Sequence, residues 1–444
     1  MIYKMKIIFF QSVLLSFLFH FSLFTASAQS DSTDTQIKIA HLKNPFDGLH
    51  WMGRVNHFSI NPDSNQTVIF TSGGVFLNSN TLPFSFSKKI LQSGFLNNEI
   101  KNNAEFYTHN LNGAAAGYKY GTGFCKRGKK NSIGLALSDE SISIINYRRD
   151  LFNLVFFGNA QYENDTAYLR GSGLANQDFH RVRFIFSSKS GSADSCWQIN
   201  ASISYLQGYH VNLFNVGKTK LYTAPMGEYL WLQSQFIYQT NDTSNSGSFA
   251  FNGNGIAADV CIAFPAGKSQ LMVAINDAGF IYWNKKSLFY GMDTTIQFDG
   301  IELENILSNS GSTISNINTD TILNYLGVKQ TKYAFNLNLP LRFTFAWNRM
   351  VMNNKIDLNA GFSFLPQYEN FPMFFASSTF NFKNFYPSVS VSYGGLQSFN
   401  MGINLEGKIC GHFNWMIGSG QILSWLMPKH LTGIDMYSQL SYSF

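Results

Sequence analysis

Charged side chains are scarce in this sequence of 444 residues. Asp, Glu, Lys and Arg together make up 13% of it, about half of the ~25% that is usual in a soluble domain. The formal net charge is +6, and Lys4 and Lys6 account for two of these charges. This positive net charge is small and spread along the chain, which argues against a nucleic-acid-binding protein.

Long apolar runs are also missing. After residue 28 no stretch of about 18 consecutive apolar residues occurs. The mean hydropathy of −0.07 is too polar for a helical membrane protein. Any crossing of a membrane must then be made by a closed β-barrel, because only helices and closed barrels satisfy their backbone hydrogen bonds in lipid.

Cysteine and histidine are few and dispersed. The four cysteines, at positions 125, 196, 261 and 410, are compatible with one or two disulfides, whose connectivity cannot be read from spacing. No pair of histidines has the spacing of a metal-binding motif. The sequence therefore predicts no metal site and no cofactor.

Aromatic residues and regular alternation are abundant. Aromatics make up 16% of the chain, and the segments 354–365 and 398–406 alternate apolar residues with small or polar ones. Segment 331–348 keeps one face apolar for about sixteen residues, more than the ~9–11 that cross a bilayer. This pattern is typical of strands with one face toward lipid and the other toward a polar interior.

The alternation predicts an all-β fold, a transmembrane antiparallel β-barrel of the outer-membrane type with about 14 strands. A soluble β-sandwich also has many short strands, but it explains neither the long ones nor the alternation of short and long links, such as Gly407 followed by 419–430. Strands are expected near 178–188, 196–207, 228–239, 247–264, 268–284, 331–349, 354–365, 372–382, 387–394, 398–406, 408–418 and 431–444, with two or more between 104 and 149.

The first 28 residues have the pattern of a signal peptide. A basic start is followed by the apolar stretch 7–24 and by the small-residue sequence Ala26-Ser27-Ala28, which is typical of a cleavage site. A transmembrane anchor is the alternative, and the cleavage site favours removal. We expect residues 29–61 to form a periplasmic or hatch-like segment and residues 62–444 to form the barrel.

The last strand ends on an aromatic residue. Leu440, Tyr442 and Phe444 share one face, and small or polar residues occupy the other. This end resembles the closing strand of bacterial outer-membrane barrels, in which the terminal aromatic residue is the signal read by the barrel-assembly machinery. The resemblance implies an outer-membrane location, with lipid and that machinery as partners, and assigns the insertion signal to Tyr442 and Phe444.

Three short motifs resemble a family of uncharacterised outer-membrane barrels from the Bacteroidota, a domain of unknown function that is similar to the long-chain fatty-acid transporter type of barrel. Asn61-Pro62 resembles the signature that closes the N-terminal hatch, although Asp63 stands where a small Ala is expected. Segment 252–259 followed by 275–283 resembles the central hairpin, and Leu339-Pro340 resembles the proline that interrupts the next strand. The resemblance implies fold and location but no established activity.

Five charged residues are candidates for the barrel interior. The alternation within each strand turns Arg181 and Arg183 inward, because Val182 between them is on the apolar, outward face. In the same way Lys332, Arg342 and Asp357 are on the face of their strands that does not carry the apolar residues. One interpretation is that they form salt bridges that fill a small lumen. The other is a basic constriction that selects anionic solutes.

An enzymatic function is not expected. Residues 107–113 resemble the His-x-Ser-Asn-Gly motif of outer-membrane phospholipases, but Leu111 stands at the position of the nucleophilic Ser. The favoured function is passage or binding of a small hydrophobic molecule. The alternative is a non-transporting structural or accessory barrel of a secretion or surface-motility complex.

Overall fold

The computed structural model describes residues 66–92, 95–128, 130–190, 197–299, 327–369, 371–409 and 412–444. The predicted signal peptide, the segment 29–61 and the hatch motif Asn61-Pro62 lie outside these residues. Among the described residues, no helix combines the length and apolar character needed to cross a membrane.

Fourteen antiparallel strands form a closed ring, which confirms the predicted fold class. The ring closes where β20 pairs with β1, with Tyr442 opposite Ile69. At this seam the Phe444 amide donates to the Thr67 carbonyl oxygen over 2.9 Å. In ring order the strands are β1 (Gln66–Ser79), β2 (Leu111–Arg127), β3 (Asn131–Arg148), β5 (Gly173–Ser190), β6 (Trp197–Val216), β9 (Gly253–Ala266), β10 (Ser269–Trp283), β14 (Arg342–Val351), β15 (Ile356–Phe364), β16 (Met373–Phe380), β17 (Ser388–Gly394), β18 (Gln397–Ile409), β19 (Phe413–Ser419) and β20 (Ile434–Ser443).

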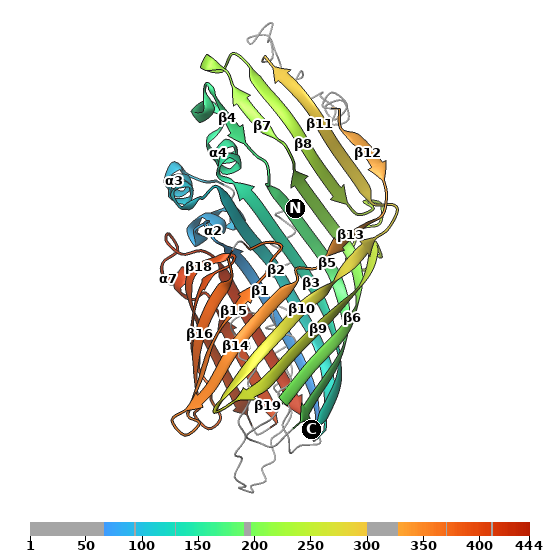
Figure 1. Cartoon of the computed structure of the whole chain (residues 1–444), viewed down its shortest axis with the longest axis vertical. Coiled ribbons are helices and arrows are strands. Elements are labelled where there is room, and N and C mark those ends of the chain that lie inside the picture. The colour runs from blue at the N-terminus through green and yellow to red at the C-terminus, as the bar shows by residue number, and fades with distance from the viewer. Residues whose placement is uncertain are drawn as a thin grey trace.

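The barrel is much taller on one side than on the other (Figure 1). β3, β5 and β6 have 18 to 20 residues, whereas β16, β17 and β19 have seven or eight. On the tall side the wall continues upward, away from the end that carries Phe444, as a further sheet. This upper sheet contains β4 (Asp165–Tyr168), β7 (Lys220–Thr223), β8 (Leu230–Thr240), β11 (Leu288–Phe298) and β12 (Lys329–Lys332).

Three details differ from the sequence prediction. The strand predicted at 228–239 is β8, which belongs to the upper sheet, and β1 takes its place in the ring. The reason is the length of β6: its lower part, 198–208, pairs with β9, and its upper part, 212–216, pairs with β8. β6 extends to Val216, beyond the strand predicted near 196–207, and the predicted link at Gly407 lies inside β18.

The long strand predicted at 331–349 is divided. It consists of β12, of β13 (Phe335–Asn338) and of β14, and the last two are separated by residues 339–341. Pro340 lies in this interruption and lacks the amide hydrogen that a continuous ladder would need. β13 and β14 both pair with β10.

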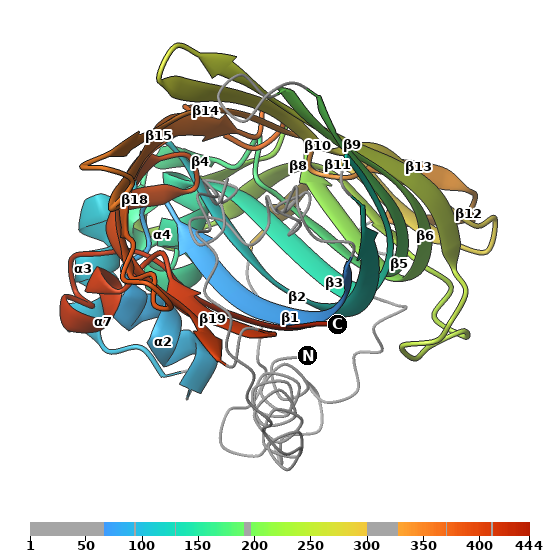
Figure 2. The ribbon, with the colours of Figure 1, turned by 90° about the horizontal axis from the view of Figure 1, so that it is seen from below.

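A group of helices lies outside the ring of strands, as the view from below shows (Figure 2). Phe86, Ala104, Tyr147 and Phe152 form its buried core. Asn97 caps α3 by accepting a hydrogen bond from the Ile100 amide over 3.0 Å, which satisfies one of the free amides of the first turn. The helices are α2 (Phe84–Gln92), α3 (Asn98–Tyr107), α4 (Arg149–Phe157) and α7 (Leu423–Leu426), with short 3-10 turns η2 (Ala160–Tyr162) and η3 (Pro225–Gly227) elsewhere.

The polarity of the wall is the reverse of that of a soluble protein. On β9 the outward Ile256 and Val260 are 56% and 41% exposed, whereas the inward Asp259 is 2% exposed. On β5 Phe184 and Phe186 are exposed and Arg181 is buried. Large apolar side chains on the outer face are what a barrel in lipid requires, and the charged side chains of Asp259 and Arg181 lie on the inner face.

Candidate functional site

The interior of the tall side is arranged in three layers along the barrel axis. Inward residues of β9 show the order: Ala263 and Cys261 lie lowest, Asp259 follows, and Ala257 lies above it. The inward residues of β5 and β10 follow the same order. A charged layer therefore separates two apolar ones, and we call these the charged belt, the lower apolar layer and the upper apolar layer.

The lower apolar layer combines small side chains with flexible or aromatic ones. Small residues at the wall leave room that Met and Phe side chains fill, and methionine adapts readily to irregular space. It contains Cys261, Ala263, Met272, Ala274, Ala346, Met373 and Phe375, all buried.

The upper apolar layer is built around Trp283, which is fully buried. The indole lies against Gly208 and Gly253, where a Cβ atom would stand 2.6 and 3.0 Å from ring atoms. Two glycines of neighbouring strands therefore allow a tryptophan inside the wall. The layer also contains Phe179, Leu206, Val211, Ala257, Ile281 and Leu339.

The charged belt is centred on Arg181, whose side chain is 1% exposed. Its Nη2 atom lies 2.6 Å from Asp277 Oδ1, and its Nε atom lies 3.5 Å from Glu140 Oε1. Glu140 also pairs with Lys119 Nζ at 2.9 Å and accepts a hydrogen bond from Ser138 Oγ. The arginine thus joins β5 to β3 and, across the interior, to β10.

A second ion pair completes the belt. Arg183 Nε lies 3.5 Å from Asp259 Oδ2, and that carboxylate also accepts hydrogen bonds from Ser202 Oγ at 2.6 Å and from the Asp277 amide at 2.8 Å. Buried charges that are paired and hydrogen-bonded avoid most of the penalty of desolvation. We define the charged belt by Lys119, Glu140, Arg181, Arg183, Asp259 and Asp277.

Asp277 reaches the belt through a backbone irregularity. The register between β9 and β10 shifts between Ile275 and Ala278, and Asp277 has φ of 56°, in the left-handed region. A β-bulge of this kind re-aims one side chain and is common near functional positions. Here the bulge places Asp277 between Arg181 and Asp259.

The five residues predicted to face the interior lie in different places in the structure. Arg181 and Arg183 lie together in the belt. Arg342 is buried, at 4% exposure, opposite Asn276 of β10, and it interacts electrostatically with the carboxylates of Glu369 and Asp277. Asp357 is buried lower on β15, where it accepts a hydrogen bond from Asn348 Nδ2. Lys332 differs from expectation: it is exposed on β12, because the interruption at Pro340 separates that strand from β14.

Four belt residues were not predicted. Lys119 and Glu140 lie on strands that the sequence indicated without bounds, and Asp259 and Asp277 lie in the segments that resemble the central hairpin. The inward parity of Glu140 follows once β3 is bounded, because it alternates with the exposed Leu137 and Ile145. No pattern in the sequence indicates the bulge that turns Asp277 inward.

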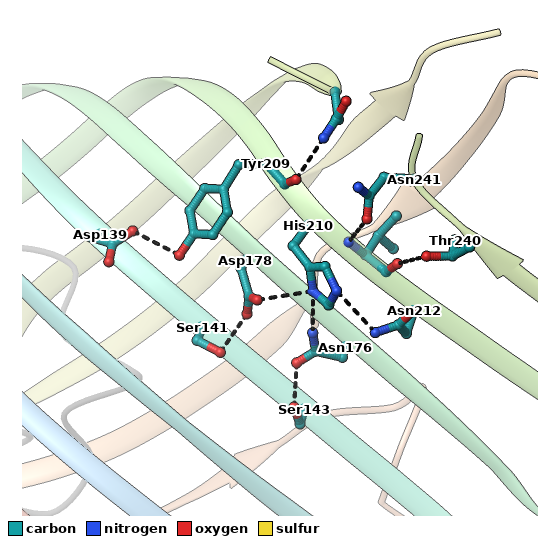
Figure 3. Close-up of polar contacts among 12 residues, drawn as sticks. Asp139, Ser141, Ser143, Asn176, Asp178, Tyr209, His210, Asn212, Thr240 and Asn241 are labelled. Carbon is teal, nitrogen blue, oxygen red and sulfur yellow. Dashed lines mark hydrogen bonds and ion pairs between the residues drawn. The ribbon is translucent and has the colours of Figure 1, made fainter. Parts of the chain in front are cut away.

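A second polar cluster lies on the opposite face of the same strands (Figure 3). His210 Nδ1 lies 3.1 Å from Asp178 Oδ2, and Ser141 Oγ donates to the other oxygen of that carboxylate over 2.6 Å. His180 Nδ1 lies 3.0 Å from Asp139 Oδ1, which also accepts a hydrogen bond from Tyr209. We call these residues the outer His–Asp cluster.

The two histidines have different hydrogen-bond roles. His180 faces acceptors on both sides, since its Nε2 atom lies 2.7 Å from the Ser248 carbonyl oxygen. Both contacts are satisfied together only when both ring nitrogens carry hydrogen. His210 Nδ1 lies near both Asp178 Oδ2 and Asn176 Nδ2, at 3.1 and 3.3 Å, and its Nε2 atom lies 3.2 Å from Asn212 Nδ2.

The outer His–Asp cluster lacks the geometry of a serine hydrolase. In a Ser-His-Asp triad the histidine stands between the serine and the carboxylate. Here Asp178 stands between Ser141 and His210, so the hydroxyl donates to a carboxylate and not to the base. Within the described part of the chain, no group of three His, Cys, Asp or Glu side chains could hold a metal ion.

Comparison with solved structures finds other β-barrels. They include a mutant of the monoaromatic hydrocarbon channel TodX (TM-score 0.45, 8% identity, covering 86% of this chain and 90% of that one). The toluene transporters TodX of Pseudomonas putida and TbuX of Ralstonia pickettii both have a TM-score of 0.41 and 8% identity, covering 86% of this chain and 89% and 90% of theirs. At these scores the fold assignment rests on the strand pairing described above.

No curated protein matches the sequence. A family model does match, over residues 60–420, and these residues include every strand of the ring except β20. The chain belongs to the family of unknown function DUF5723.

Proposed function

We propose that this protein resides in the outer membrane and binds a small apolar molecule inside its barrel, for passage across the membrane. The observation that supports this most directly is the pair of apolar layers in the interior. A general porin has a polar, water-filled interior, whereas Met272, Met373, Phe375 and Trp283 face inward here.

The charged belt is the proposed barrier between the layers. It contains three cationic and three anionic side chains, joined by ion pairs. This balance favours salt bridges that fill the interior over a basic constriction that attracts anions. A molecule that passes must displace these pairs or move beside them, so free passage of ions is not expected.

The location has its own test. The mature protein is expected in outer-membrane fractions and is expected to migrate faster on gels when it is not heated, as folded barrels do. Insertion by the barrel-assembly machinery further predicts reduced assembly after deletion of Phe444. Recovery of the intact wild type from the soluble periplasm would contradict the proposed location.

Ligand binding is tested with an apolar fluorescent probe, N-phenyl-1-naphthylamine, and the purified protein in detergent. Saturable binding is expected, and Ala263→Phe is expected to weaken it because the new ring fills the lower apolar layer. Ala258→Phe is the matched control, because Ala258 lies on the same strand and faces outward. Equal binding by both variants would place the ligand elsewhere.

Conductance separates this function from that of an open channel. In planar bilayers the wild type is expected to conduct poorly, and Arg342→Glu is expected to change ion preference only if an open pore exists. Large, anion-selective currents would favour the basic constriction instead.

A structural or accessory role is the second candidate. The observation in its favour is the ordered upper sheet, which extends the wall well beyond the ring (Figure 1). Absence of both conductance and probe binding would favour this role. Cross-linking of intact cells through Lys332, which is exposed on β12, would then be expected to capture a partner protein.

A further inference from the structure

The helices outside the barrel carry an unusual number of exposed apolar side chains. The most exposed are Phe106 at 81%, Phe95 and Leu426 at 74%, and Val155 at 63%. Trp425, Met427 and Leu91 are also exposed, at 54%, 49% and 39%. These residues belong to α2, α3, α4 and α7 or adjoin them, and we call the four helices the helical overhang.

The helical overhang is one packed body, so the exposure of these side chains is not a consequence of loose structure. α3 and the residues after α7 are joined by a hydrogen bond from Asn103 Nδ2 to the Lys429 carbonyl oxygen and by an ion pair between Lys429 and Glu99, each at 2.9 Å. The Phe84 and Trp425 rings lie 5.9 Å apart. A lone exposed leucine needs no explanation, but several large apolar groups on one body indicate an interaction surface.

Phe106 is exposed because of its position on α3, on a different face from the residues that pack in the helical core. Ala104 is buried in the helical core and Ile100 packs against it. With 3.6 residues per turn, Phe106 lies about 160° around the helix from Ala104 and about 120° from Ile100. The same helix therefore has an apolar side chain on the face that its core does not cover.

The height of the helical overhang along the barrel axis, relative to the apolar band of the outer wall, indicates which surroundings its exposed side chains meet. The outward residues of β1 from Ile69 to Leu77 and of β20 from Tyr442 to Ile434 are apolar except for Thr71, Gly73 and Ser438. Eight residues of a strand tilted by about 40° rise about 20 Å, close to the ~25 Å height of the apolar band of an outer-membrane barrel. The overhang begins directly above this band, since the Phe84 amide donates to the Leu431 carbonyl oxygen and Pro83 pairs with Thr432.

We propose that the helical overhang rests on the outer leaflet of the same membrane, with its exposed aromatic and aliphatic side chains inserted at the boundary of headgroups and acyl chains. α2, α3 and α7 lie outside the ring of strands (Figure 2), so they extend sideways above the proposed apolar band. The same body has exposed basic groups at Lys88, at Lys429, which pairs with Glu99, and at Arg149, which pairs with Glu105, and basic groups at this level are suited to lipid phosphates, as in interfacial amphipathic helices. This inference rests on the proposed location in the outer membrane.

The test measures the depth of nitroxide spin labels in vesicles of phosphatidylethanolamine and phosphatidylglycerol. Single cysteines replace Phe106 and Leu426 in a background whose native cysteines are changed to alanine and whose folded mobility on gels equals that of the wild type. Labels at Phe184 and Ile203, on the apolar wall, report lipid, and a label at Glu228, exposed in the turn between β7 and β8, reports water. Power saturation with oxygen and with a water-soluble nickel chelate gives the depth.

Labels at Phe106 and Leu426 are expected to be accessible to oxygen and protected from nickel, as the wall labels are. Nickel accessibility equal to that at Glu228 would overturn the inference and leave the proposed location intact, provided that the wall labels report lipid. Protection from both reagents would also overturn it, because a protein surface would then cover the overhang. Nickel accessibility of the wall labels themselves would overturn the inference together with the location.

Discussion

Two acid–base pairs on the same pair of strands point to opposite sides of the wall. Inside, Arg181 and Glu140 meet in the charged belt, and outside, His180 and Asp139 meet in the outer His–Asp cluster. Glu140 and Asp139 are adjacent in the sequence. The side chain of Arg181 is 1% exposed, whereas that of His180 is 27% exposed.

The difference shows how strand parity assigns chemistry. The inner pair is closed off from water and uses a guanidinium, which stays charged at any ordinary pH. The outer pair lies at the surface and uses an imidazole. A shift of one residue along each strand therefore separates a buried ion pair from one that water reaches.

The largest expected effect comes from breaking the inner pair. Arg181→Met leaves Asp277 without its ion pair in the interior, and removing one partner of a buried pair typically destabilises by about 3–5 kcal/mol. Urea unfolding of the barrel in detergent micelles measures the change. His180→Gln, one residue away on the other face, is expected to change stability by less than about 1 kcal/mol, and equal losses would remove the distinction between the faces.

A smaller effect is expected from placing a charge on the outer face of the short side. Ile403→Asp introduces a carboxylate at a position that is 43% exposed on the outer face, and in the proposed membrane location it should destabilise by about 2 kcal/mol. Asn404→Asp is the control, because Asn404 is buried on the inner face. Folding yields measured by gel mobility should fall for the first variant only, and the reverse order would show the parity of β18 to be wrong.

The bulge at Asp277 provides a third comparison. Asp277→Gly and Asp277→Ala both remove the carboxylate that pairs with Arg181. Only the alanine variant has a Cβ atom, which disfavours the positive φ at this position. The alanine variant is therefore expected to be about 1 kcal/mol less stable than the glycine variant. The same unfolding experiment detects this, and identical stabilities would mean that the bulge relaxes once its side chain is gone.

The smallest effect is expected at an ion pair that water surrounds. Lys429 holds the pKa of the Glu99 carboxyl below its ordinary value, through a hydrogen bond and charge attraction. Lys429→Met should raise the pKa of Glu99 toward that ordinary value, which NMR titration measures, and leave the melting temperature unchanged. A clear loss of stability would show that this surface pair behaves like the buried ones.

Alternation along the strands was sufficient to predict the fold. The contrasts of Ile403 with Asn404 and of Phe184 with Arg183 indicate which side of each strand faces outward, because side chains in a strand alternate wherever no bulge interrupts them. Low charge and the absence of long apolar runs made a closed barrel the one membrane fold open to the chain. These features are local, so they can be read in order along the sequence.

Partners across the sheet depend on the closed ring and could not be read in this way. β8 alternates like its neighbours and yet lies in the upper sheet, because β6 is long enough to pair with two strands on one edge. Arg181 was expected to face inward, but its partner Asp277 is 96 residues away and turns inward only at a bulge. The periodicity of the chain thus determined which face each side chain occupies, and the closure and register of the barrel decided which charges meet, since ion pairs need contact within a few ångströms that only the assembled sheet provides.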